Sequence, residues 1–155
     1  MTLFPESSEQ LGGRAVLLSV KPRFCDQILA RSKRVEFRRS WPAGTDIGVM
    51  VLYSSSPVQQ LVGVAFVDHV EERDDEGLWA LACQFGGGLE RDELTGYFHG
   101  KKKGFGILIN EVRVAPVAVD PKHLFRDFRP PQSYQYLSPE EFSLVMARLF
   151  PSEQK

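Results

Sequence analysis

The chain has 155 residues and a formal net charge of −1, so it suits one domain with a sizeable core and is not a basic polymer. Hydrophobic residues make up 43% and charged residues 25%, which is ordinary for a soluble globular protein. No apolar run approaches the roughly 18–20 residues that cross a bilayer, and no signal-peptide pattern is visible. We therefore expect a cytoplasmic protein without membrane contact. Its two cysteines, Cys25 and Cys83, form neither a disulfide framework nor a metal-type pair.

The first part of the chain predicts a strand, a short helix and a second strand. Residues 1–13 are polar and end in two glycines, so we expect a flexible leader, with residues 14–155 forming a single domain. The apolar run of residues 14–20 predicts a buried strand, and Pro22 stands where a helix would begin. Apolar residues at helical spacing extend that helix to about Arg31.

Residues 32–39 predict a strand whose two faces differ in chemistry. Val35 and Phe37 alternate with polar residues and should face the core. The other face would carry charge, from Arg34, Glu36 and Arg38. The simpler interpretation is a solvated face with weak surface ion pairs. The alternative is a functional site, because positive charge is concentrated here in a nearly neutral chain, where a helix meets a strand.

The rest of the chain alternates strands with short helices. The patterns predict strands at residues 46–54, 60–70 and 105–117, and helices at residues 78–85, 90–98 and 138–150. Three glycines at residues 86–88 predict a helix stop, since no Lys-Ser/Thr follows them as in a phosphate-binding loop. Residues 120–137 are rich in proline and aromatic residues and should wrap around the body. We therefore expect an α+β fold with a small mixed sheet, forming a closed or nearly closed β-barrel with short flanking helices.

Several short motifs occur in a fixed order along the chain. Leu18-Ser19-Val20-Lys21-Pro22 precedes the first helix, and Lys33-x-x-Glu36-x-Arg38 follows it. The later motifs are Tyr53-Ser54-Ser55-Ser56-Pro57, Val62-Gly63, Tyr97-Phe98-His99-Gly100 and Pro130-Pro131-Gln132-Ser133-Tyr134. This ordered set, spanning about residues 15–137, resembles the ASCH domain family. One departure is Arg31, which stands at the family's usual glycine, so a left-handed turn is not expected there.

The resemblance implies a PUA-like mixed β-barrel with an RNA-facing cleft between the barrel and the helix. Some ASCH-type proteins are hydrolases of acetylated cytidine, and ribonuclease activity has been proposed within the family. In the amidohydrolase branch a lysine and a threonine follow the helix. Lys33 matches that lysine, whereas Glu36 stands at the threonine position. The histidines are far apart and no metal-ligand spacing stands out, so we expect no metal and no cofactor.

Two hypotheses follow for the function. The first is a module that binds single-stranded or modified RNA, or a nucleotide-like ligand. Its predicted RNA-binding residues are Lys21, Lys33, Arg38 and Lys101 for phosphates, with Tyr53 and Ser54 also at the site. Tyr53 or Tyr97 would stack on a base, and Glu36 would accept hydrogen bonds or orient Arg38. For both tyrosines the alternative is core packing with a hydrogen-bonded hydroxyl.

The second hypothesis is an enzyme that uses the same cleft, a hydrolase of RNA or of a modified nucleoside. In this case the predicted catalytic residues are Lys33, Glu36 and Tyr97. A desolvated Lys33 would polarise the scissile group, Glu36 would serve as general acid or base, and Tyr97 or Ser54 would assist. Neither the RNA nor the oligomeric state follows from the sequence.

Overall fold

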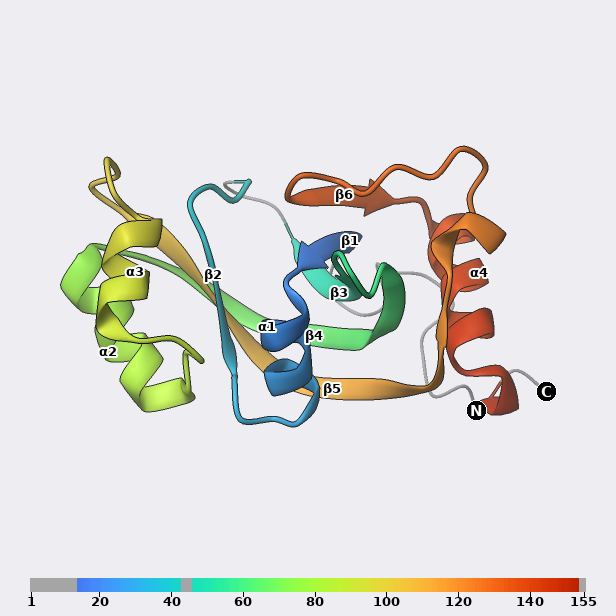
Figure 1. Cartoon of the computed structure of the whole chain (residues 1–155), viewed down its shortest axis with the longest axis horizontal. Helices are drawn as coiled ribbons and strands as arrows, with labels where there is room; N and C mark the ends of the chain where they lie inside the picture. Colours follow the sequence, from blue (N-terminus) through green and yellow to red (C-terminus); the bar gives the residue numbers. More distant parts are fainter. Residues whose placement is uncertain (1–13, 43–45, 154–155) are drawn as a thin grey trace.

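The computed structural model describes residues 14–42 and 46–153, which form one sheet with helices on both of its faces (Figure 1). The strands are β1 Arg14–Val20, β2 Val35–Arg38, β3 Ile47–Ser54, β4 Gln60–Arg73, β5 Gly104–Val119 and β6 Tyr134–Leu137. The helices are α1 Pro22–Leu29, α2 Asp75–Phe85, α3 Arg91–Tyr97 and α4 Pro139–Leu149, with short 3-10 turns at Pro121–His123 and Pro151–Glu153. The predicted leader of residues 1–13 lies outside the described residues, and the single-domain assignment stays a prediction.

The six strands are arranged in the order β2-β5-β4-β3-β1-β6. β1 runs parallel to β3 and every other neighbouring pair is antiparallel, so the predicted α+β fold with a mixed sheet is confirmed. The sheet is not closed, because β2 and β6 are its two edges. The order and directions of the strands are nevertheless consistent with the expected PUA-like, barrel-like fold. Among the described residues, no helix has the length and apolar character needed to cross a membrane.

The two edges of the sheet are connected through one side chain. Arg38, at the end of β2, donates from Nη1 to the hydroxyl of Ser133, which directly precedes β6, at 3.3 Å. It also donates from Nη2 to the backbone carbonyl of Ser19 in β1 at 2.8 Å. Side-chain hydrogen bonds therefore span the gap that backbone pairing leaves open.

β1 and β3 are apolar on both faces because a helix covers each side. On one face Leu17 and Val51 belong to the same buried cluster as Leu149 of α4. On the other face Leu18 packs in a second cluster with Ile28 of α1. Each fully buried side chain of this kind contributes about 1.5–3 kcal/mol by leaving water. This two-sided burial explains why the sequences of β1 and β3 are nearly continuous apolar runs.

A third cluster attaches α2 and α3 to the end of the sheet that contains β2. Val35 and Phe37 of β2 pack there with Leu78 of α2 and with Leu94 of α3. Phe98, at the end of α3, meets Phe37 edge-on with ring centroids 6.3 Å apart. This packing places one side of α3 next to β2.

Several predicted elements are confirmed and a few boundaries are wrong. α1 begins with Pro22, and α4 begins with a capping box in which Ser138 and Glu141 exchange hydrogen bonds. β4 continues to Arg73, beyond the predicted end at residue 70, and α2 starts at Asp75 instead of residue 78. β6 lies inside the segment that was expected only to wrap, and it pairs antiparallel with β1.

Arg31 adopts the left-handed conformation, with φ of 67°, so the expectation that no left-handed turn occurs there is wrong. The reason is the way α1 ends. The backbone N–H groups of Ser32 and Lys33 both donate to the carbonyl of Gln27, at 3.0 and 3.1 Å. This helix-end arrangement needs a reversal at residue 31. The turn is therefore imposed by backbone hydrogen bonds even though the residue is not glycine.

We predict that Arg31→Gly leaves the protein as stable as before or raises its free energy of unfolding by up to about 1 kcal/mol. The left-handed conformation costs an ordinary residue about 1–2 kcal/mol, and glycine adds back about 0.5–1 kcal/mol of backbone entropy. Urea unfolding of the purified variant measures the difference.

The matched control is Ala30→Gly, one residue earlier, where φ is −79° and glycine brings no relief. This control should lose about 0.5–1 kcal/mol. Equal losses in the two variants would contradict the strain at Arg31.

Candidate functional site

A cavity of about 570 Å³ opens where the end of β1, the start of α1, strand β2 and helix α3 meet. Its charged lining residues are Lys21, Arg23, Lys33, Arg38, Glu36 and Glu93, and its aromatic ones are Phe24, Phe37, Tyr53 and Tyr97. Residues 130–132, which precede β6, complete the wall. Four cations thus face two carboxylates beside several rings.

Glu36 lies in this cavity as a buried carboxylate, only 5% exposed. Its Oε2 accepts from Nε of Arg38 at 3.0 Å and lies 2.8 Å from Nη2 of the same residue. Its Oε1 lies 3.6 Å from Nζ of Lys33. Burying a charged group is unfavourable unless it is paired, so Lys33 and Arg38 are both needed to offset the cost of burying this carboxylate. The simpler interpretation of this strand face, a solvated surface, is therefore wrong for Glu36 and Arg38, although Arg34 is exposed.

Lys33 is almost completely enclosed, with 1% of its surface exposed. Its ammonium donates to the backbone carbonyl of Gly87 at 2.5 Å. It also lies 4.8 Å from the ring centroid of Phe24 and 5.2 Å from that of Phe37. Burial lowers the pKa of Lys33, and the nearby Glu36 carboxylate opposes that shift.

The three glycines after α2 form part of the same structure. Gly86 ends the helix in the left-handed conformation, with φ of 72°, which confirms the predicted helix stop. A side chain at Gly86 would collide with the carbonyl of Ser32, and one at Gly88 with the amide oxygen of Gln27. The glycines thus let the backbone approach closely enough for Gly87 to accept from Lys33. The sequence predicted the helix stop but not this close approach of the backbone to Lys33.

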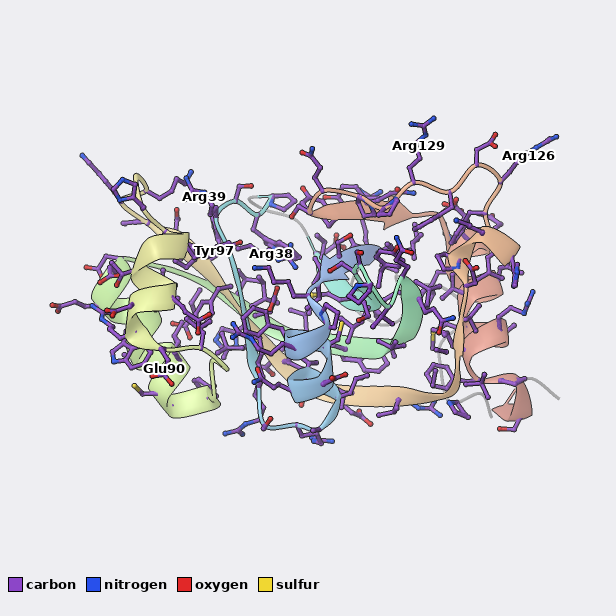
Figure 2. All side chains as sticks on the ribbon, viewed as in Figure 1. Arg38, Arg39, Glu90, Tyr97, Arg126 and Arg129 are labelled. Carbon is purple, nitrogen blue, oxygen red and sulfur yellow. The ribbon has the colours of Figure 1, made fainter. Side chains whose placement is uncertain are left out.

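Tyr97 is the most exposed of the predicted catalytic residues, at 43%. It extends from the end of α3 toward Arg38 (Figure 2). Burial of its hydroxyl end raises the pKa of Tyr97, with Arg38 and Glu36 close enough to act on it in opposite directions. The neighbouring Arg39 fixes this helix end by donating to the carbonyls of Tyr97 and His99 at 2.7 and 3.0 Å.

The predicted site residues do not all reach the cavity. Its lining includes Lys21, Lys33, Glu36, Arg38, Tyr53 and Tyr97. Tyr53 is only 3% exposed and its ring lies 5.5 Å from that of Phe128, so most of it is core. Ser54 is buried beside the thiol of Cys25, to which it is hydrogen-bonded, and is not part of the lining. Lys101 lies in the exposed loop between α3 and β5, in a separate hollow bordered by Asp75 and Thr95.

Sequence reasoning missed several lining residues. Arg23 and Glu93 form an ion pair of 2.6 Å although 70 positions separate them in the chain. The hydroxyl of Ser19 donates to the carbonyl of Pro131 at 2.7 Å, which attaches the loop before β6 to β1. The ASCH-like motifs contained Ser19 and Pro131, but nothing in the sequence paired Arg23 with Glu93.

Comparisons with known proteins agree with this fold. The chain is 28% identical over 145 residues to a protein named ASCH domain-containing ribonuclease from Zymomonas mobilis, covering 91% of this chain and 92% of the relative. The crystal structure of ASCH from Zymomonas mobilis matches with a TM-score of 0.76 and 25% identity, over 86% of this chain and 94% of that one. A scan against models of protein families finds no match.

Two further solved structures extend the likeness. A crystal structure of a serine-to-alanine variant of the Zymomonas mobilis protein has a TM-score of 0.77 at 23% identity, over 88% of this chain and 97% of that one. The N-terminal domain of Staphylothermus marinus McrB has a TM-score of 0.57 at 13% identity, over 89% of this chain and 96% of that one, which shows the fold alone.

The open, barrel-like mixed sheet with a cavity beside α1 is consistent with a PUA-like fold. The ordered motifs indicated a more specific resemblance to the ASCH domain family, and the curated relative and the crystal structure of ASCH from Zymomonas mobilis confirm this resemblance.

We predict that Glu36→Gln lowers the free energy of unfolding by about 3–5 kcal/mol at neutral pH, because two buried cations lose their counter-charge. Urea unfolding followed by circular dichroism measures it. The control is Asp75→Asn, which removes one carboxylate from the half-exposed pair with Arg91 and should cost about 0–1 kcal/mol. Similar losses for the two variants would mean that the Glu36 cluster does not hold the fold together.

Proposed function

We propose that this protein has an RNA-related function and that it binds an unpaired stretch of RNA, or a nucleotide-like ligand, in the cavity beside α1. The observation that carries the proposal is the combination of cationic and aromatic side chains around one opening of about 570 Å³. The similarity to a protein named ASCH domain-containing ribonuclease supports it.

The chemistry of the lining suits a nucleotide better than a purely apolar ligand. Unpaired bases can stack on aromatic rings, and cationic side chains contact the phosphates. Tyr97 offers a partly exposed ring at the opening, whereas Tyr53 is too enclosed to offer more than an edge. Lys21 lies exposed at the start of α1 on the same opening. Lys101 does not line this cavity but a separate hollow, bordered by Thr95 and His99 near the C-terminal end of α3, so we assign that lysine a supporting contact with a longer strand at most.

The second candidate is a hydrolase that acts in the same cavity. It is favoured by the enclosed Lys33, whose pKa is lowered by burial, and by the Tyr97 hydroxyl close to Arg38 and Glu36. Clusters of ionisable groups with shifted pKa values occur often at active sites. In this hypothesis Tyr97 contacts the substrate, Glu36 acts as general acid or base, and Lys33 and Arg38 stabilise developing negative charge.

Tyr97→Phe separates the two candidates with little damage to the fold, because it removes only a hydroxyl group and keeps the ring of this half-exposed residue. A binding module should keep its affinity for a labelled oligouridylate within about twofold, since the stacking ring remains. An enzyme should lose about 10²-fold or more of its turnover if the hydroxyl transfers a proton. The measurements are fluorescence anisotropy for binding, and chromatography of RNA oligomers and acetylated cytidine for turnover.

The salt dependence of the affinity tests whether cationic side chains of the cavity contact RNA phosphates. Each phosphate neutralised on a single strand contributes a slope of about −0.7 to the plot of log K against log salt. Lys21→Gln should flatten the slope by about that amount. An affinity that does not depend on salt, or no binding and no turnover with any RNA, would contradict the proposed function.

A further inference from the structure

The cations that line the cavity differ in whether their donors are already used. Each of the three guanidinium nitrogens of Arg38 donates within the protein, to Glu36, to Ser133 and to Ser19. Lys33 is 1% exposed and donates to the carbonyl of Gly87. The two buried cations therefore stabilise the fold, and the exposed cations are better placed to donate hydrogen bonds to a ligand phosphate.

The exposed cations at the opening are Lys21 and Arg23, at the start of α1. Arg23 is held in place by its own surroundings, because its guanidinium carbon lies 4.4 Å above the ring centroid of Phe24. Phe24 lines the cavity and also borders the Lys33 ammonium. Arg23 is thus presented at the opening with its fork of N–H donors in a restricted position, which suits a phosphate group.

In the structure Arg23 already holds a carboxylate. Its Nη2 lies 2.6 Å from Oε2 of Glu93, a residue of α3 that also lines the cavity. The two side chains are 52% and 44% exposed, so the pair spans the opening between α1 and α3 in contact with water. Exposed pairs of this kind are weak and screened by salt, and a competing anion can replace one partner.

Glu93 is fixed for a separate reason. Its Oε1 accepts the backbone N–H of Glu90 at 3.1 Å and completes the capping box that begins α3. One oxygen of Glu93 therefore caps the helix while the other occupies Arg23. The position of the second oxygen is consequently set by the helix rather than by Arg23.

We propose that the Arg23–Glu93 pair is an internal latch at the cavity opening, in which the Glu93 carboxylate occupies the place of a ligand phosphate and must be displaced from Arg23 when that phosphate binds. This inference rests on the proposed function for the identity of the ligand, an RNA phosphate. It adds two residues that sequence reasoning did not assign to the site. Arg23 becomes a phosphate-binding residue and Glu93 its competitor.

The decisive variant is Glu93→Gln, because glutamine keeps the oxygen that caps α3 and removes only the negative charge. It should tighten binding of a labelled oligouridylate by about two- to fivefold at low salt. The matched control is Asp92→Asn, which removes the same charge from the preceding residue of α3, outside the cavity lining. That control should change the affinity by less than about twofold.

A double-mutant cycle separates the latch from general electrostatics. Arg23→Gln should weaken binding, and in that background Glu93→Gln should bring no more gain than Asp92→Asn does. If Glu93→Gln gives its full gain even without Arg23, or gives no gain in the wild-type background, the latch is refuted.

Inorganic pyrophosphate, which has phosphates but no base or sugar, tests the latch independently of RNA. Calorimetric titration of the same variants should show the same order of affinities. If pyrophosphate follows this order while no RNA binds, the latch stands and the proposed RNA function fails. If RNA binds but neither ligand responds to the Arg23 and Glu93 variants as described, the proposed function stands and the latch fails. Absence of binding by both ligands would overturn both.

Discussion

The buried carboxylate of Glu36 is the constraint on which the arrangement of this protein depends. A carboxylate removed from water needs cationic partners, and Lys33 and Arg38 supply them from the same short segment. Those two cations in turn bind backbone groups elsewhere, at Ser19 in β1 and at Gly87 after α2. This charge cluster thereby connects the edge strand β2 to β1, near the other edge of the open sheet, and to the glycine segment after α2.

Much of the fold follows from local patterns in the sequence. The apolar runs of β1 and β3 predict burial on both faces, and the Ser138-Pro139 start of α4 is a direct consequence of helix capping. β6 was missed because its strand character comes from pairing with β1, more than 100 residues away, and not from a run of apolar residues. The conformation of Arg31 was mispredicted because backbone hydrogen bonds at the end of α1 outweigh the preference of the side chain.

The candidate site was predictable only in part, for a related reason. The alternation in β2 places Glu36 and Arg38 on one face, but spacing alone cannot show that this face is enclosed by α3 and by residues 130–132. Enclosure changes the roles that we assign to the cations: Lys33 and Arg38 are occupied within the protein, whereas Lys21 keeps its predicted role and, in our proposal, Arg23 joins it in contacting a ligand. The pairing of Arg23 with Glu93 depends on how α1 and α3 face each other, which no local motif encodes.

The cavity therefore has two parts, a buried charge cluster that stabilises the fold and an exposed rim that we propose contacts the ligand. Chemical-shift mapping with an oligouridylate tests this division most directly, because each backbone amide reports its own surroundings. We predict the largest changes at Arg23, Glu93 and Tyr97, with smaller ones in the loop around Lys101. Changes confined to the Lys101 loop, with none at the cavity rim, would contradict it.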